Sequence, residues 1–139
     1  MNDQPDLVER LNASNRNTLM EVLEIRYTDA GADFLEASMP VGPRVHQPMG
    51  ILHGGASAAL AESVGSAASA VRIDLGRQRV VGTELSINHL RSISEGRLTA
   101  RAEAVHLGRS KHLWDIRIQD QDGRLIAVSR LAMMVLDNA

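Results

Sequence analysis

The sequence contains no cysteine and only one Trp, one Tyr and one Phe among its 139 residues. The absence of cysteine excludes a disulfide scaffold, a thiolate zinc site and a cysteine nucleophile. Aromatic residues make up 2% of the chain. We therefore expect an aliphatic core and no stacking platform for single-stranded nucleic acid.

Neither sign of charge dominates, because 15 Lys and Arg stand against 17 Asp and Glu, a net charge of -2. This balance argues against binding to a nucleic-acid backbone. The chain start, MNDQPD, lacks the basic and apolar regions of a signal peptide. The longest apolar stretch, residues 56–73, includes Glu62 and Arg72 and is not expected to span a bilayer. We expect one cytoplasmic domain, residues 1–139, whose 44% hydrophobic residues supply a core.

Hydrophobic periodicity predicts a helix, two strands, a second helix and four more strands. Residues 6–20 are expected to form a short helix followed by a polar break. The Ala- and Ser-rich residues 56–71 predict a helix of about 16 residues, and its apolar surface predicts that it is buried all round. The expected strands comprise residues 22–28, 33–39, 79–90, 97–106, 111–119 and 124–136.

Turn residues separate several of these strands. Residues 29–32, 94–96 and 120–123 have the composition of hairpin turns. Consecutive hairpins indicate an antiparallel meander, and one long apolar helix needs a sheet curved around it. The sequence thus predicts an α+β fold in which a curved antiparallel sheet of about six strands wraps one long helix.

Glu62 is the one Asp, Glu, Lys or Arg between Arg44 and Arg72, and it lies in the middle of the predicted helix. Ser66 and Ser69 are expected on the same side of that helix. A carboxylate among alanines is costly to bury unless it is paired or has a raised pKa. Glu62 is therefore either paired with a core His or Arg, or placed at a polar seam between subunits, or a general base or nucleophile in a pocket.

The start of the long helix carries a second candidate feature. In His53-Gly54-Gly55, two glycine N–H groups stand at a helix N-terminus, where the helix dipole favours an oxyanion or a polarised carbonyl. Glycine is also common where a loop simply turns into a helix. Together with Glu62, the pair describes acyl chemistry, in which the N–H groups bind the carbonyl oxygen and the carboxylate acts on the carbonyl carbon.

Other catalytic and metal-binding motifs are absent from the sequence. It has no G-x-S-x-G, H-E-x-x-H, P-loop or G-x-G-x-x-G pattern, and its five histidines lack ligand spacing, so no metal site is expected. His89 shares strand parity with Leu85 and Ile87, which fits either a core histidine or a pocket residue. Arg91 and the run from His106 to Lys111 are either solvated turn charges or ligands for the phosphates of an acyl carrier.

The run from His46 to Ser66, HQPMGILHGGASAALAESVGS, closely resembles the hotdog-fold acyl-CoA thioesterases. The most similar branch includes the enterobactin-pathway proofreading thioesterase and the 1,4-dihydroxy-2-naphthoyl-CoA thioesterase. Residues 81–85, 94–96 and 106–109 also resemble that family, and the likeness extends over nearly the whole chain. The family belongs to the phenylacetate-degradation thioesterase superfamily, in which some relatives carry Asp at the position of Glu62.

The resemblance implies hydrolysis of acyl-CoA esters by a hotdog homodimer, commonly a dimer-of-dimers tetramer, with active sites at the dimer seam. It implies no cofactor, since CoA is part of the substrate, and no nucleic-acid or membrane partner. The implied catalytic set is Glu62 as nucleophile or general base, Gly54 as N–H donor to the thioester C=O, Gln47 and His53 of the other subunit, and Ser66 near the attacking water.

The resemblance also implies a set of residues along the acyl and CoA channel, with Arg91, Arg109 and Ser110 near the nucleotide. The full set is Gly82, His89, Arg91, His106, Gly108, Arg109 and Ser110. Met49 and Leu90 depart from common family residues, which leaves the acyl group open among hydroxybenzoyl, dihydroxynaphthoyl, phenylacetyl and medium-chain groups. Two alternatives remain: a hotdog hydratase or dehydratase using His53 with Glu62, and a non-catalytic acyl-CoA-binding module.

Overall fold

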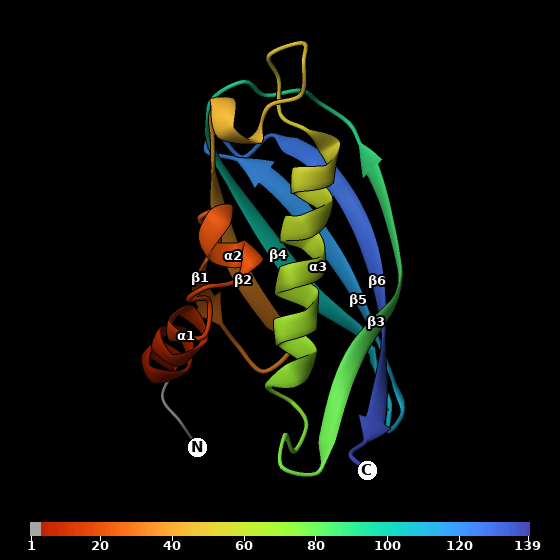
Figure 1. The fold of residues 1–139 in the computed structure, drawn as a ribbon. Coiled ribbons are helices and arrows are strands. Elements are labelled where there is room, and N and C mark those ends of the chain that lie inside the picture. Colours follow the sequence, from red (N-terminus) through yellow and green to blue (C-terminus); the bar gives the residue numbers. More distant parts are fainter. Residues whose placement is uncertain (1–3) are drawn as a thin grey trace.

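A six-stranded antiparallel sheet curves around one long helix in the computed structural model, which describes residues 4–139 (Figure 1). The first three residues, which begin the segment expected to lack a signal peptide, lie outside the described residues. The elements in chain order are α1 (Gln4–Ala13), α2 (Leu19–Val22), β1 (Arg26–Ala30), β2 (Phe34–Val41), the 3-10 helix η1 (Pro43–Val45), α3 (Gly54–Ala70), β3 (Gln78–His89), β4 (Gly96–Leu107), β5 (Lys111–Asp120) and β6 (Leu125–Asp137).

The long helix α3 confirms the predicted Ala-rich helix, and it has a defined start and end. His53 is its N-cap residue, and the helix ends at Ala70. Just beyond, the Arg72 guanidinium donates to the backbone oxygens of Ala68, Gly31 and Ala32 at 2.7, 2.8 and 2.9 Å. These bonds tie the carbonyl end of α3 to the β1–β2 turn, where a cation also suits the helix dipole.

The strand order is β1-β2-β4-β5-β6-β3, which corrects the expected simple meander. β3 forms an edge and pairs with β6, while β4 pairs with β2 and β5. Residues 94–96 therefore belong to a crossing from the edge to the middle of the sheet rather than to a hairpin. The strand order could not be predicted from these signals, because turn residues indicate where the chain reverses and not which strands pair.

The N-terminal boundaries also differ from the sequence prediction. The expected strand 22–28 is instead β1 at Arg26–Ala30, because Val22 ends the short helix α2. The expected helix and polar break over 6–20 is α1 followed by a turn region and the start of α2. No helix among residues 4–139 is long and apolar enough to cross a membrane.

The core lies between α3 and the concave face of the sheet. Leu98, Trp114 and Leu131 of three neighbouring strands are fully buried there. A Cβ added at Gly65 would lie 2.5 Å from Leu131 Cδ2, so the missing side chain lets α3 approach the sheet. The expectation that α3 is buried all round is wrong for one face, where Glu62 is exposed.

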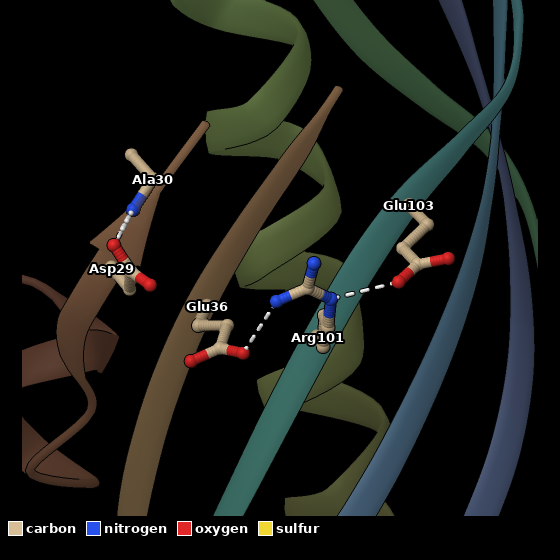
Figure 2. Close-up of polar contacts among 5 residues, drawn as sticks. All are labelled: Asp29, Ala30, Glu36, Arg101 and Glu103. Carbon is tan, nitrogen blue, oxygen red and sulfur yellow. Dashed lines mark hydrogen bonds and ion pairs between the residues drawn. The ribbon is translucent and has the colours of Figure 1, made fainter. Parts of the chain in front are cut away.

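The convex face of the sheet is polar and carries cross-strand ion pairs. Figure 2 shows Arg101 between Glu36 of β2 and Glu103 of its own strand, at 2.8 and 2.7 Å. Arg130 of β6 pairs with Asp115 of β5 at 2.8 Å. This alternation of charged and buried residues follows from the period of two in a strand.

Candidate active site

A groove of about 1020 Å³ runs along the face of α3 that the sheet leaves open. Glu62 lines it, together with mostly apolar side chains from α1, α2, β3 and α3. Within residues 4–139, Glu62 has neither an ion pair nor a side-chain hydrogen bond. The hypothesis that Glu62 is paired with a core His or Arg therefore fails in this chain. A carboxylate facing an apolar groove is available to a ligand.

Gly82 and Ser66 lie beside Glu62. A Cβ built on Gly82 would lie 3.7 Å from the Glu62 carboxyl carbon and 3.8 Å from Oε2, so β3 passes close to the carboxylate. The Ser66 hydroxyl, one helical turn beyond Glu62, lines the same groove and lies 3.7 Å from the sulfur of Met133. These residues form the acidic half of the candidate site.

A second, smaller groove of about 350 Å³ lies at the N-terminus of α3. Gln47, Gly54, His89 and Arg91 line it, so four predicted site residues meet there. The His89 ring packs on Gly54, because a Cβ added to that glycine would lie 2.8 Å from His89 Nε2. His89 is exposed, which favours the pocket interpretation over a core histidine.

Only one of the two glycine N–H groups at this helix start is free to bind a ligand. The Gly55 N–H donates to His53 Nδ1 at 2.7 Å. The Gly54 N–H has no acceptor among the described residues. The sequence prediction of two donors is thereby reduced to one, because the N-cap side chain takes the other.

The structure also identifies a polar group that the sequence did not single out. Ser57 lines the smaller groove, is fully buried, and its hydroxyl has no hydrogen-bond partner in the described chain. Gln47 is better satisfied, since its side-chain oxygen accepts from the Met49 N–H and its backbone N–H donates to Ile51 O at 2.8 Å. Spacing alone could not distinguish Ser57 from the other serines of α3.

The two halves of the candidate site lie apart within one chain. Glu62 follows Gly54 by eight residues, which separates them by about 12 Å along the helix axis. No residue lines both grooves. His53 precedes Gly54, so it is also remote from Glu62. This spacing and the separate grooves argue against one thioester contacting the Gly54 N–H and the Glu62 carboxylate of the same chain.

The residues predicted to line the acyl and CoA channel also fall into two groups, at opposite ends of β3. Gly108, Arg109 and Ser110 form the β4–β5 turn, and strand register connects that end of the sheet with the Gly82 end of β3. His106 packs at this turn, because a Cβ at Gly108 would lie 2.5 Å from His106 Nε2. His89 and Arg91 are at the other end of β3. Gly82 and His89 are seven positions apart, which corresponds to about 23 Å in a strand.

A buried polar cluster lies at the far end of α3. Ser69 accepts a hydrogen bond from Trp114 Nε1 at 2.7 Å, and its hydroxyl lies 2.8 Å from His112 Nδ1. Ser69 therefore faces β5 and not the groove, contrary to the sequence expectation. Burial, reinforced by the nearby Arg72 guanidinium, lowers the pKa of His112. Within the described range, no His, Asp and Glu side chains are grouped closely enough to hold a metal ion.

Comparisons with known proteins agree with this architecture. The family model of the thioesterase superfamily matches residues 49–127. The proofreading thioesterase EntH of Cronobacter turicensis is 50% identical, over 93% of each chain. The 1,4-dihydroxy-2-naphthoyl-CoA hydrolase of Escherichia coli is 46% identical, over 93% of this chain and 94% of the other.

The crystal structure of a thioesterase variant from Pseudomonas aeruginosa superposes with a TM-score of 0.92 at 47% identity, over 94% of both chains. This likeness confirms the hotdog fold that the sequence resemblance predicted. The family match covers the helix that carries Gly54 and Glu62. The chain belongs to the thioesterase superfamily, and its reaction is thioester hydrolysis.

Proposed function

We propose that the thioester is an acyl-CoA ester, with Glu62 as its general base or nucleophile and the Gly54 N–H as the hydrogen-bond donor to its carbonyl. The observation that carries this proposal is the pairing of two unsatisfied groups: a carboxylate free of partners at an apolar groove and a free N–H at a helix N-terminus. The N–H binds the oxygen more strongly as that oxygen gains charge in the transition state.

We further propose that each active site takes these two groups from two copies of the chain. The separation of about 12 Å along α3 favours a second copy as the source of one group if both groups act on one carbonyl. β3 supplies a means of association, because it is an edge strand whose outer side has no strand partner among residues 4–139. Unpaired edges favour pairing with another strand.

Antiparallel pairing of two β3 edges around their midpoint gives a two-fold symmetric dimer. In such a dimer the Gly82 end of one copy adjoins the His89 end of the other. The acidic half of one copy would then face Gln47, His53 and Gly54 of its partner. Arg109 and Ser110 of one copy would come close to Arg91 of the other, where they could bind CoA phosphates. A dimer of such dimers gives the expected tetramer.

In the general-base form of the reaction, Glu62 takes a proton from water, whose oxygen bonds to the thioester carbon. The carbonyl oxygen becomes negative and accepts from the Gly54 N–H. When the carbonyl re-forms, the C–S bond breaks and the CoA thiolate leaves and takes up the proton. In the nucleophilic form, a Glu62 oxygen bonds to the carbon, and the C–S bond breaks so that CoA leaves as the thiolate and an acyl-Glu62 anhydride remains. Water then cleaves the anhydride to the free acid and the Glu62 carboxylate, and the thiolate takes up the released proton.

We propose an aromatic acyl group, of the hydroxybenzoyl or dihydroxynaphthoyl type, from the sequence resemblance and from the name of the E. coli relative. The reaction asks only for a base, a hydrogen-bond donor and water, so we propose that it uses no metal or redox cofactor. A cytoplasmic location remains a prediction from the sequence.

The test is release of free CoA thiol from hydroxybenzoyl-, dihydroxynaphthoyl-, phenylacetyl- and octanoyl-CoA. We expect the wild type to release thiol from at least one aryl ester, and Glu62→Gln to lower kcat at least about a hundredfold. Glu9→Gln is a matched control, since Glu9 is an exposed α1 residue that lines neither groove.

Three outcomes would contradict the proposal. Equal activity of Glu62→Gln and Glu9→Gln would exclude Glu62 from the chemistry. Binding of every ester without thiol release would support the acyl-CoA-binding module. Hydration of an unsaturated acyl-CoA with the thioester intact would support a hydratase.

A further inference from the structure

A buried histidine joins the last turn of α3 to the turn between β4 and β5. His112 is buried, and its Nδ1 lies 2.8 Å from the Ser69 hydroxyl. Its ring also forms a hydrogen bond with the Gly108 backbone. Ser69 is the last residue but one of α3, and Gly108 is the first residue after β4. The His112 ring therefore bridges two elements that lie at the same end of the molecule (Figure 1).

The hydrogen-bond partners of His112 specify one neutral tautomer. The Trp114 Nε1–H donates to the Ser69 hydroxyl oxygen at 2.7 Å, because an indole nitrogen can only donate. The Ser69 hydroxyl proton is then directed to His112 Nδ1, which accepts it. A carbonyl oxygen can only accept, so the ring proton is on Nε2 and is donated to Gly108 O. The three side chains thus form a continuous hydrogen-bonded chain from Trp114 to Gly108.

The surroundings of His112 keep its ring neutral. Burial lowers the pKa of His112, and the positive charge of Arg72 lowers it further. The Arg72 guanidinium carbon lies 5.1 Å from the centroid of the Trp114 ring, next to the hydrogen-bonded chain. His106 of β4 also disfavours a proton on His112. A neutral imidazole offers one donor and one acceptor, which are the two functions that this bridge uses.

Backbone hydrogen bonds hold the β4–β5 turn to the sheet. The Gly108 N–H donates to Lys111 O at 2.8 Å across the turn, and the Val135 N–H of β6 donates to Ser110 O at 2.9 Å. A Cβ at Gly108 would lie 3.0 Å from Lys111 O, so the turn is tightly closed. These bonds fix the turn relative to the neighbouring strands.

His112 fixes the same turn relative to α3. That helix also carries Glu62, which precedes Ser69 by seven residues, or about 10 Å along the helix axis. The position of the turn relative to the Glu62 carboxylate therefore depends on the bridge from Ser69 through His112 to Gly108.

The turn presents exposed polar side chains that suit an anion. Arg109 and Ser110 are exposed, and Arg109 forms no ion pair within residues 4–139. A guanidinium and a hydroxyl both donate to phosphate oxygens. Long exposed side chains lose rotamer freedom when they bind, so a backbone that is already fixed lowers the cost of binding.

We infer that His112 is a positioning residue, which holds the β4–β5 turn at the end of α3 so that Arg109 and Ser110 meet the phosphates of CoA. This inference rests on the proposed function, because it takes CoA as the leaving group and Glu62 as the group that acts on the thioester. His112 itself contacts neither the CoA nor the thioester.

The experiment compares hydroxybenzoyl-CoA with hydroxybenzoyl-pantetheine, which has the same thioester but none of the phosphates. His112→Leu removes both hydrogen bonds of the ring, whereas His112→Gln keeps one amide donor and one amide acceptor. We expect His112→Leu to raise KM for the CoA ester about tenfold and to change kcat less than about twofold. His112→Gln should restore most of the lost affinity. For the pantetheine ester, kcat/KM should change less than about twofold in either variant.

Two further variants separate positioning from general loss of structure. Ser129→Ala is the matched control, since the buried Ser129 hydroxyl donates to Ser86 O at 2.8 Å, between β6 and β3. It should leave KM for both esters unchanged. Ser69→Ala removes the bridge from its α3 end and should raise KM for the CoA ester as His112→Leu does, which keeps the test available if His112→Leu does not fold.

A double variant tests whether His112 acts through the turn. In the Arg109→Gln background, His112→Leu should raise KM for the CoA ester less than about twofold further, because the group that it positions is already lost. Additive effects of the two substitutions would overturn the inference. Equal KM changes for the CoA and pantetheine esters, or equal effects of His112→Leu and Ser129→Ala, would also overturn it.

The affinity for free CoA, measured by calorimetry, supplies a readout that needs no turnover. If no ester is hydrolysed but His112→Leu still weakens CoA binding about tenfold, the proposed reaction fails and the positioning role stands. If the esters are hydrolysed and His112→Leu leaves CoA affinity unchanged, the reaction stands and the positioning role fails.

Discussion

The two faces of α3 are built from the same small residues but have opposite surroundings. Gly65 and Ser69 lie on the face that the sheet closes, whereas Ala59 and Ser66 lie on the face that forms the groove. On the closed face, small side chains permit close packing against Leu131. On the open face, they leave space beside a carboxylate. The same composition thus gives close packing on one face and a groove on the other.

The N-terminal end and the middle of the open face differ as well. The N-terminal end presents one free N–H, from Gly54, with His89 packed against it. The middle presents one free carboxylate, from Glu62, with Gly82 beside it. Each region holds one of the two groups to which the proposed hydrolysis assigns a role. The comparison leads to substitutions that separate the effects on turnover from those on stability.

The largest effect in this set is expected for Gly54→Ala. The new Cβ would meet His89 Nε2 at 2.8 Å, so the ring or the helix start must move. A displacement of about 1 Å in a catalytic group can lower the rate about a hundredfold, and we expect a loss of that size in kcat. Gly42→Ala is the control, because its Cβ would meet nothing within 4 Å. Equal kcat values for both variants would show that the Gly54 end takes no part in turnover.

Ser69→Ala and Ser66→Ala compare the two faces directly. Ser69→Ala leaves the Trp114 Nε1–H and His112 Nδ1 without their buried partner. We expect its free energy of unfolding to fall by about 1–3 kcal/mol. Ser66→Ala should change stability by less than about 0.5 kcal/mol while it lowers kcat. Denaturant unfolding and thiol-release assays on both variants measure these quantities. The reverse pattern would mean that we have assigned the faces incorrectly.

The sequence predicted the parts of this picture that depend on local patterns. The Ala-rich run gave α3, and strict alternation in residues 97–106 and 111–119 gave β4 and β5. Glu62 could be identified because a charged side chain among alanines is costly to bury unless it has a partner or a function. The position of β3 at the edge could not be predicted, since it depends on which strands pair across the sheet. The capping of Gly55 by His53 depends on a side-chain rotamer that no pattern specifies.

The side of the Glu62 groove that α1 forms could not be predicted from the sequence, for a related reason. Leu7 and Leu11 were assigned to a short helix, and nothing local indicated that this helix would face α3 across a gap. The gap depends on Asn12 pairing with the Tyr27 backbone, a contact between residues fifteen positions apart. Polar residues in an amphipathic helix usually indicate solvent exposure, so an asparagine that binds a strand edge is not recognisable from the sequence.

A smaller effect is expected from pH, and it concerns the closed face. Burial lowers the pKa of His112 in the folded state. As pH falls below about 6.5, the unfolded chain takes up a proton that the folded chain does not, so the free energy of unfolding decreases. His112→Gln should show a weaker pH dependence in this range. Parallel curves for the wild type and His112→Gln would contradict this assignment.

The central claim, that one active site joins Glu62 of one copy to Gly54 of another, is tested most directly by mixing two inactive variants. Glu62→Gln and Gly54→Ala are coexpressed, and thiol release is compared with each variant alone. Random pairing makes half of the dimers mixed, each with one intact site, so the account predicts recovery of about a quarter of wild-type activity. Activity no higher than the mean of the two separate variants would contradict it.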